Sequence, residues 1–317
     1  MLRPEDPREP EHIGHELDAF CAYATKVCGL AQSTLISRRM WVDRFLQYHF
    51  PASDIAPSKL ETKDIGNFFI AQCQGYQPGS AQVVASAVRS YLRFRAVQNE
   101  DQVEALIAAI PAAARWRLAA LPESLPPDDV IKLLGSCDRQ QPQGQRDYAI
   151  LRCLVDLGLR SCEVAALWLE DLNWKCATLT ISKGKSHRAD VLPLPSATGD
   201  AIATYLHSGR RQAKPALGNR AVFIRHRAPL THPVDTSVIR SVVRQAAARS
   251  GLDDKLHGPH LLRHSAATRM LQGGASLKEI ADVLRHRSLD TTAIYAKVDI
   301  ARLSTIAQPW PITGGAA

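Results

Sequence analysis

The stretch Gly258-Pro259-His260-Leu261-Leu262-Arg263-His264 decides how the second half of the chain is interpreted. Pro259 suits the first position of a helix, because its fixed φ is helical and its missing N–H is not needed there. His260, Arg263 and His264 then share one face of the opening turns, since they are three and four residues apart. Free backbone N–H groups and the helix dipole attract anions to such an N-terminus, and an arginine binds phosphate through two donors. The stretch therefore predicts a phosphate site on a helix.

A zinc-binding helix is the rival interpretation of this stretch, because His260 and His264 lie four residues apart. A metalloprotease helix of that type needs Glu directly after the first histidine, and this chain has Leu261 there. We therefore expect neither a metal nor a cofactor, and we interpret His264 as a buried structural histidine or as a partner of a site residue.

Arg160 stands at a second expected helix start. An apolar helix over 145–157 is expected to stop at Gly158, and Ser161 restarts a helix with Glu163 in its first turn. The Arg160 side chain therefore also lies at a helix N-terminus, where it suits an anion or an ion pair. We interpret Glu163 as an ion-pair residue that can orient Arg160, rather than as a catalytic acid.

A basic turn, Ser182-Lys183-Gly184-Lys185-Ser186-His187-Arg188, joins two segments with strand-like sequence, 177–181 and 189–194. A lysine on such a hairpin can protonate a leaving oxygen, which works near pH 7 if neighbouring cations lower its pKa from ~10.4. We expect Lys183 in this role. Lys185 is the alternative, and either lysine could simply contact a nucleic-acid backbone.

His286 and Tyr295 complete a set of groups suited to one phosphate. Ser288 is expected to cap a fresh helix between them, so they belong to different elements. A tyrosine with a pKa of ~10 is a weak nucleophile unless cations stabilise its phenolate. A tyrosine in Ala293-Ile294-Tyr295 would by itself more often be a core residue, and only the basic set upstream indicates a nucleophile.

In order and spacing, this set resembles the tyrosine recombinase family (phage-type and Xer-like integrases). The resemblance rests on Arg160, the hairpin Lys183, His260-x-x-Arg263, His286 after 23 more residues and Tyr295 after nine more, and it covers nearly all of 13–310. It implies a mainly α fold with a small antiparallel β-sheet. An N-terminal helical core-binding (SAM-like) domain would precede a C-terminal α+β catalytic domain.

The resemblance also implies a role for each residue. Arg160 and Arg263 would clamp the scissile phosphate, Lys183 would be the general acid, and His260 and His286 would assist proton transfer and phosphate binding. Tyr295 would form a covalent 3′-phosphotyrosine bond, which the 5′-hydroxyl of a partner strand later attacks. Because that bond conserves the energy of the diester and the cations replace a metal, the reaction would need no ATP.

Two places depart from the family pattern. The family usually has Gly where Arg285 precedes His286, and an arginine there adds charge near the phosphate. The hairpin is slightly longer than usual, and Ser182 replaces the first glycine of the family's Gly-Lys-Gly. Lys183 still precedes a glycine, which favours it over Lys185.

Composition indicates a two-domain chain of 317 residues with a formal net charge of +8 and a pI near 9.2. Residues 1–120 hold 13 basic and 13 acidic side chains, so residues 121–317 carry the whole excess. Such a surface suits a polyanion, although a solvated basic surface is equally compatible with the charge. Seven scattered cysteines, no apolar run that could span a bilayer and no apolar leader favour a cytoplasmic protein without disulfides.

The order of elements predicts four regions. These are a disordered lead over 1–12, a helical core-binding domain over 13–108, a linker over 109–127 and a catalytic domain with a C-terminal tail over 128–317. The helical patterns of the first domain cover 13–28, 33–49, 62–73 with Thr62 as N-cap, and 79–98. Those of the second cover 197–213, 235–250, 259–272, 277–285 with a Ser276/Glu279 capping box, and 289–298; a third strand is expected at 222–224.

The resulting hypothesis is a site-specific DNA recombinase or integrase, carried by a mobile element. Its expected partners are double-stranded DNA and further copies of the chain, as a tetramer on paired DNA sites or together with related recombinases, with no membrane partner. One alternative is a type IB topoisomerase-like nicking-closing enzyme. The other is a non-catalytic DNA-binding relative, which would not need all six site residues.

Overall fold

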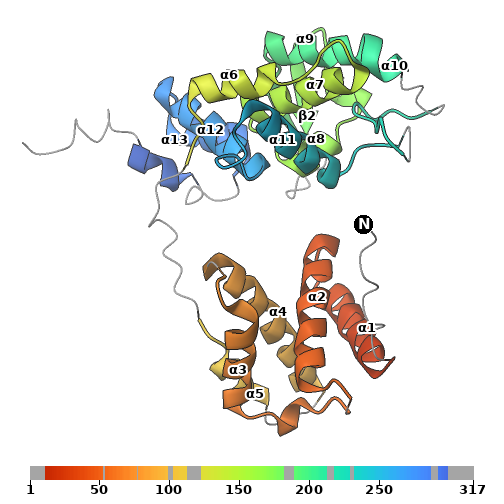
Figure 1. Ribbon diagram of the computed structural model, residues 1–317, viewed down its shortest axis with the longest axis vertical. Helices are drawn as coiled ribbons and strands as arrows, with labels where there is room; N and C mark the ends of the chain where they lie inside the picture. The colour runs from red at the N-terminus through yellow and green to blue at the C-terminus, as the bar shows by residue number, and fades with distance from the viewer. Residues whose placement is uncertain are drawn as a thin grey trace, which may run out of the picture. The chain divides into compact units, whose positions relative to one another are not determined.

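Two compact units make up the chain, Met1–Arg117 and Leu118–Ala317 (Figure 1). The structure is a computed structural model, and it describes residues 11–52, 54–76, 78–98, 103–112, 123–181, 189–212, 218–228, 232–286 and 292–298. The boundary between the units lies within the segment 109–127.

The first unit is all helical in its described residues, and each of its four expected helices is present within two residues of its expected ends. A fifth helix was not predicted, and two details were wrong. The first helix begins at Glu11, inside the expected lead, and the N-cap of the third is Glu61 rather than Thr62. The helices are α1 (Glu11–Lys26), α2 (Gln32–His49), the 3-10 turn η1 (Pro57–Lys59), α3 (Thr62–Cys73), α4 (Pro78–Val97) and α5 (Val103–Ala109).

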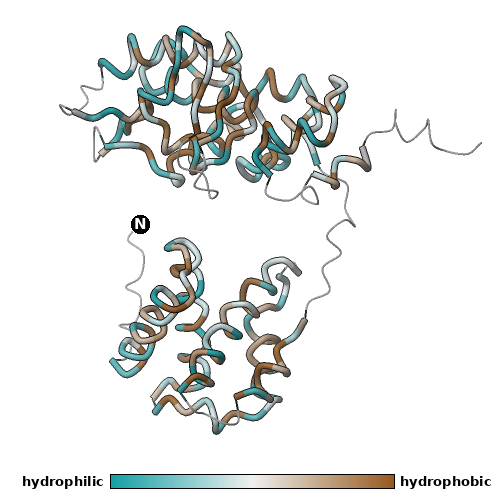
Figure 2. Tube along the Cα trace, turned by 180° about the vertical axis from the view of Figure 1, so that it is seen from behind, coloured by the Kyte–Doolittle hydropathy of each residue, from teal (hydrophilic) through white to brown (hydrophobic). Residues whose placement is uncertain are grey.

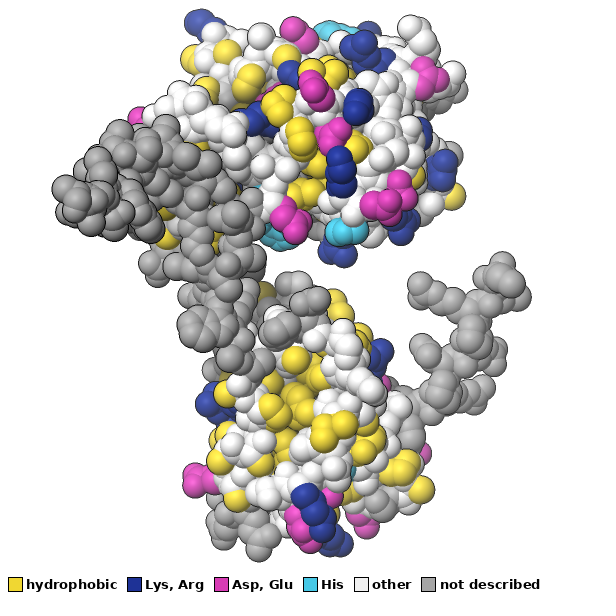
Figure 3. Space-filling model, turned by 60° about the vertical axis from the view of Figure 1, so that its left-hand side comes forward, with side chains coloured by type: hydrophobic (Ala, Val, Ile, Leu, Met, Phe, Trp, Pro, Cys, Tyr) yellow, Lys and Arg dark blue, Asp and Glu magenta, His cyan; other side chains and the backbone are white. Residues whose placement is uncertain are grey.

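Aromatic side chains fill the core of this unit. Phe20 and Tyr91 pack edge to face with centroids 5.9 Å apart, and Phe45 and Phe68 do the same at 5.2 Å. This geometry is the one that ring quadrupoles favour. The apolar residues follow the inner faces of the helices in Figure 2. Figure 3 also shows hydrophobic side chains gathered on the outside of this unit, whose exposed residues include Ile70 and Val97.

The second unit combines helices with a three-stranded antiparallel sheet of order β1-β2-β3, which confirms the expected fold class. The two predicted strands are β2 (Thr178–Ile181) and β3 (Asp190–Pro193), and Leu179 pairs with Leu192. The expected strand at 222–224 was wrong. The third strand is β1 (Leu172–Asn173). The segment near 222 forms only two isolated bridges, Ala221 with Trp168 and Ile224 with Pro233, because the pairing does not continue to the residues next to them.

The helices of the second unit surround the long apolar α7. Buried side chains of α7 include Ile150, Leu151 and Leu154, and the helix contacts α6, α8, α9, α11 and α12 (Figure 1). The elements are α6 (Pro127–Gly135), α7 (Pro142–Asp156), α8 (Ser161–Ala165), the 3-10 turn η2 (Leu169–Asp171), α9 (Ser196–Thr204), the π-helix η3 (Tyr205–Gly209), α10 (Arg210–Gln212), α11 (Thr236–Ser250), α12 (Pro259–Gln272), α13 (Leu277–Leu284) and the 3-10 helix η5 (Ala293–Val298).

Several local predictions in this unit are confirmed. Pro259 occupies the start of α12, and Ser276 with Glu279 forms the capping box of α13. The expected helix at 289–298 is a 3-10 helix over its described part, while Ser288 lies outside the described residues.

Across both units, all seven cysteines are free thiols. Among the described helices, none is both long and apolar enough to cross a membrane.

Gly158 ends the α7 region in the left-handed conformation, with φ 59°. A Cβ at this position would lie 2.6 Å from Cδ2 of Leu284, which belongs to α13. Glycine therefore satisfies both the backbone turn and the close approach of a distant helix. The turn leads directly into Arg160 and so positions the first residue of the candidate site.

Candidate active site

Arg160 is the N-cap residue of α8, just before Ser161, where the sequence predicted a helix start. Glu163 binds both its side chain and its backbone N–H. The Glu163 carboxylate accepts a hydrogen bond from Nη1 of Arg160 at 2.7 Å and another from its backbone N–H at 2.7 Å. The Arg160 side chain is 33% exposed, whereas that of Glu163 is 2% exposed. Glu163 therefore orients Arg160, and the guanidinium keeps an open side that an anion can reach.

Arg263 lies on the first turns of α12 and is buried. Its Nη1 donates to the Gly158 carbonyl at 2.5 Å, and its Nη2 donates to the carbonyl of Leu284. Burial, together with the charge of Arg160, lowers the pKa of Arg263 to about 9, so the guanidinium stays charged at pH 7. Arg263 thus joins the end of the α7 region to the end of α13 and brings a buried positive charge to their meeting point.

Arg285 enters this cluster as a second partner of Glu163. It forms the C-cap of α13 with φ 55°, and its Nη2 donates to Oε2 of Glu163 at 2.6 Å. Burial alone would raise the pKa of Glu163, but the charge of Arg285 and the hydrogen bonds from Arg160 and Arg285 outweigh it and leave that pKa below its usual value. Glu163 is therefore ionised and balances only part of the surrounding positive charge.

Tyr295 is buried, 1% exposed, in a small apolar cluster with residues of α12 and α13. Its hydroxyl forms a hydrogen bond of 2.7 Å with Nδ1 of His264. Burial raises the pKa of Tyr295 to about 12, against the opposing charge of Arg263. The phenol is therefore protonated at pH 7. Of the two roles considered for His264 from the sequence, the structure shows the second, a partner of a site residue.

The two other histidines differ in their surroundings. His286 forms a hydrogen bond of 2.6 Å between Nδ1 and Oγ1 of Thr292. Burial and the charges of Arg263 and Arg160 lower the pKa of His286 to about 4. His260 is exposed at the start of α12, and desolvation of its ring, with the same two charges, lowers its pKa as well. Both imidazoles are therefore neutral at pH 7 in the free protein.

Five of the six predicted site residues thus come together in the second unit. The charges of Arg160 and Arg263 act on His260 and His286, and the charge of Arg263 acts on Tyr295. The sixth, Lys183, lies outside the described residues, as does its alternative Lys185. His260 and His264 have ring centroids 6.5 Å apart, and the described residues contain no group of three or more potential metal ligands.

Two contacts of the site were not expected from the sequence. Thr292 is fully buried beside His286, and Arg285 pairs with Glu163, 122 positions earlier in the chain. The only sequence signal was at Arg285, where the expected glycine is missing. A left-handed C-cap explains why glycine suits that position.

Several arginines of α2 and α4 in the first unit lie in two different surroundings. Arg38, Arg89 and Arg93 line one surface hollow together with Ser86 and Ser90, and none of the described residues that line it is acidic. Arg38 donates to the hydroxyl of Ser90 at 2.7 Å. Arg95 instead pairs with Glu16 at 2.9 Å and is largely buried.

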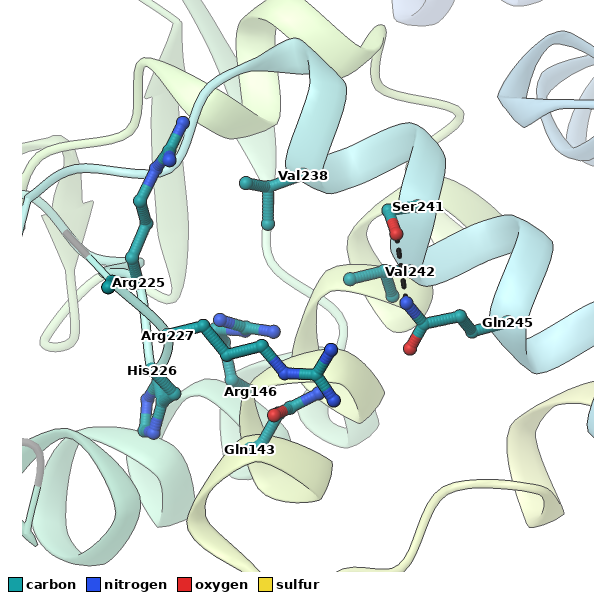
Figure 4. A pocket seen from close by; sticks show the side chains of 10 residues that line it. Gln143, Arg146, Arg225, His226, Arg227, Val238, Ser241, Val242 and Gln245 are labelled. Carbon is teal, nitrogen blue, oxygen red and sulfur yellow. Dashed lines mark hydrogen bonds between the residues drawn. The ribbon is translucent and has the colours of Figure 1, made fainter. Parts of the chain in front are cut away.

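A separate cavity of 120 Å³ lies between the start of α7, the loop 225–228 and α11 (Figure 4). Arginines line it, but Arg146 pairs with Asp147 and Arg225 pairs with Asp235. Figure 4 shows Ser241 and Gln245 hydrogen-bonded to each other along α11. The cavity shares no lining residue with the catalytic cluster, and its paired arginines are explained by the fold.

The depressed histidine pKa values predict acid sensitivity. His286 and His226 have pKa values of about 4 in the folded protein, because burial and nearby arginines disfavour their charged forms, whereas 6.5 is their ordinary value. The unfolded chain therefore takes up protons first as the pH falls. We expect the free energy of unfolding, measured by urea denaturation, to fall steadily from pH 6.5 to pH 4. His226→Gln should make that fall shallower. A free energy of unfolding that does not change with pH would contradict the lowered pKa values of His286 and His226.

Known proteins resemble this chain over both of its units. The model of the phage integrase family matches residues 123–302. The integrase/recombinase y4rA of Sinorhizobium fredii is 38% identical, over 97% of this chain and 73% of that protein. Tyrosine recombinase XerD of Listeria monocytogenes is 30% identical, over 88% of this chain and 92% of its own length.

Two solved structures share the fold. The XerH site-specific recombinase bound to palindromic difH substrate superposes with a TM-score of 0.71 at 19% identity, over 96% of this chain and 90% of that one. A lambda integrase dimer bound to a COC′ core site gives a TM-score of 0.65 at 18% identity, over 94% of this chain and 99% of that one. The family match, the close relatives and the cluster around Arg263 lead to one conclusion: the chain belongs to the phage integrase family and is a tyrosine recombinase, an enzyme that breaks and rejoins DNA strands.

Proposed function

We propose that this tyrosine recombinase cuts and rejoins double-stranded DNA at specific sites with Tyr295 as nucleophile and Arg160, Lys183, His260, Arg263 and His286 as its catalytic set. The observation that carries this assignment is a shared cluster of charges in the second unit: Arg160 and Arg263 act on His286, and Arg263 also acts on the buried Tyr295. The biological role we propose is integration or excision of a mobile element, which the integrase/recombinase relative supports.

The guanidiniums have donors to spare for a phosphate. An arginine carries five N–H groups. Arg263 uses one on each of two backbone carbonyls, and Arg160 binds Glu163 and the Arg285 carbonyl. The remaining donors, with Nε2 of His286 and the ring of His260, can bind the non-bridging oxygens of one diester. Charge that develops on those oxygens in the transition state is stabilised by groups already in position.

The covalent step is a displacement at phosphorus. The Tyr295 hydroxyl gives its proton to an imidazole of the site, and its oxygen forms a bond to phosphorus. The bond from phosphorus to the 5′-oxygen breaks, and Lys183 supplies the proton that this oxygen takes up. Attack by a 5′-hydroxyl then reverses the step, so the ends are rejoined without an external energy source.

The phenol of Tyr295 has to change its partner before it can attack. In the free protein its hydroxyl is buried against His264 and has a raised pKa, which is the state of a poor nucleophile. A bound phosphate monoanion beside Arg263 gives the phenolic oxygen an electrophile to approach. We therefore place cleavage after DNA binding.

The first unit supports a DNA-binding role in its own right. Arg38, Arg89 and Arg93 line a hollow whose described lining residues include no acid, which suits contacts with the phosphate backbone. Exposed apolar residues of the same unit, such as Ile70 and Val97, suit contacts with protein. We propose further copies of this chain as that partner, in a tetramer on paired DNA sites. The C-terminal tail after Val298 lies outside the described residues.

Recombination and simple relaxation can be separated in one experiment. A plasmid that carries two copies of the chain's own DNA site should yield recombinant molecules, whose junctions can be sequenced. A type IB topoisomerase-like enzyme would instead relax a supercoiled plasmid without any such site. Relaxation without recombinants would favour that alternative, and loss of both activities in the presence of DNA binding would favour a non-catalytic relative.

Lys183 can be tested as the general acid with a 5′-sulfur leaving group. Sulfur leaves as a thiolate and needs no proton, so the substrate should restore cleavage by Lys183→Ala to near the wild-type rate. It should not rescue Arg263→Ala, which has lost a phosphate contact. The measurement is the rate of covalent adduct formation on oxygen and sulfur substrates. Rescue of Lys185→Ala in place of Lys183→Ala would move the role to Lys185.

A further inference from the structure

Arg285 occupies a backbone position that favours glycine. At the C-cap of α13 its φ is 55°, and Ala177 is the only other non-glycine residue of the described segments with a positive φ. A side chain with a Cβ is disfavoured in this conformation. Backbone strain of this kind persists when surrounding interactions hold it in place, and it often accompanies function. The contacts of the Arg285 side chain are therefore informative.

Those contacts are buried and point to Glu163. The Arg285 side chain is 7% exposed and that of Glu163 is 2% exposed, and Nη2 donates to Oε2 at 2.6 Å. A second donor, Nη1, bonds the carbonyl of Val283 at 2.8 Å. Arg285 could reach a DNA phosphate directly only by leaving this buried ion pair, which would strand the Glu163 carboxylate without its main counter-charge.

The pair changes the charge that Arg160 presents. Glu163 has one negative charge and is bonded by two guanidiniums, Arg160 on Oε1 and Arg285 on Oε2. The trio therefore has a net charge of one positive unit. With glycine in place of Arg285, Glu163 would be balanced by Arg160 alone, and both of its oxygens would compete with a phosphate for that guanidinium. The Arg285 carbonyl also accepts a hydrogen bond from Nη2 of Arg160 at 3.2 Å, which helps to fix its direction.

We propose that Arg285 is a positioning residue of this recombinase, which neutralises Glu163 so that the guanidinium of Arg160 keeps its charge and its direction for the scissile phosphate. The proposal rests on the function proposed above, in which Arg160 is part of the phosphate clamp. It assigns to Arg285 an effect through Glu163 and Arg160 rather than a contact with DNA.

Charge restoration is the test of this proposal. Arg285→Gly should lower the single-turnover rate of adduct formation on a nicked substrate on the order of tenfold, the scale of couplings within one ion-pair network. The double variant Arg285→Gly with Glu163→Gln returns the net charge at Arg160 to one positive unit, and it should recover most of the lost rate. Arg285→Lys, which keeps the cation, should lose less than Arg285→Gly. Melting temperatures of all variants separate effects on folding from effects on rate.

Each other outcome overturns the proposal. A rate that falls equally in Arg285→Gly and in the double variant would mean that Arg285 contacts the phosphate itself. An unchanged rate in Arg285→Gly would reduce Arg285 to a helix cap. Arg227→Gly, which removes a positive charge from the cavity in Figure 4, is the matched control and should leave the rate unchanged. Failure of the proposed function is distinguishable, because Arg160→Ala would then react like the wild type or the wild type would form no adduct.

Discussion

Tyr295→Phe is expected to abolish the covalent protein–DNA adduct while DNA binding stays within about twofold of the wild type. The substitution removes the only atom that can bond to phosphorus in the proposed mechanism, and it leaves every cation of the site in place. It also removes the hydrogen bond to His264, so the free energy of unfolding should fall by about 1 kcal/mol. The adduct is measured by gel electrophoresis in SDS with a nicked substrate, and binding is measured by fluorescence anisotropy.

Tyr205→Phe is a matched control for this experiment. Tyr205 is also buried, and its hydroxyl forms a 3.1 Å hydrogen bond with Nε2 of His226, outside the catalytic cluster, and accepts a second one from the Ile224 N–H at 3.4 Å. The control should lose at least as much stability as Tyr295→Phe and still form the adduct at the wild-type rate. An adduct that survives in Tyr295→Phe would refute the assignment of the nucleophile, whatever the control does.

Arg263→Lys should lower the rate of adduct formation by roughly 10²–10³-fold, the loss that follows removal of one fixed donor from a transition-state site. Lysine keeps the charge, but its single ammonium cannot reach the carbonyls of Gly158 and Leu284 and also bind a phosphate. The free energy of unfolding should fall by about 1–3 kcal/mol, because buried carbonyls lose their donor. Single-turnover kinetics and urea denaturation measure the two effects.

Arg269→Lys separates these effects. Arg269 lies on the same helix, α12, and donates to the carbonyl of Val155, so its replacement also costs a bond between helices. It belongs to no part of the phosphate site. We expect a loss of stability with an unchanged rate, and a wild-type rate in Arg263→Lys would remove Arg263 from the phosphate clamp.

Short-range patterns account for the parts of the fold that the sequence predicts well. Pro259 starts α12, Ser276 and Glu279 cap α13, and the apolar periods of the first unit locate its four longer helices, because each of these signals acts within one or two turns. The third strand was misplaced at 222–224 for the opposite reason. A run of three apolar residues does not itself specify a neighbouring strand. The tertiary packing around this run allows only isolated bridges.

The amino-acid sequence by itself determined which residues form the candidate site, because their types and order are properties of the chain. It also determined that Arg160 precedes the first residue of a helix and that Arg263 lies in the first turns of another, where backbone dipoles favour anions. Only the tertiary structure decided the burial, the hydrogen-bond partners and the charge environment of these residues. Packing of η5 against α12 and α13 buried Tyr295 and gave its hydroxyl to His264, and the approach of α13 to α8 paired Arg285 with Glu163. Burial and charge at these residues depend on other elements, 31 positions away for Tyr295 and His264 and 122 for Arg285 and Glu163, and no local pattern of the sequence encodes them.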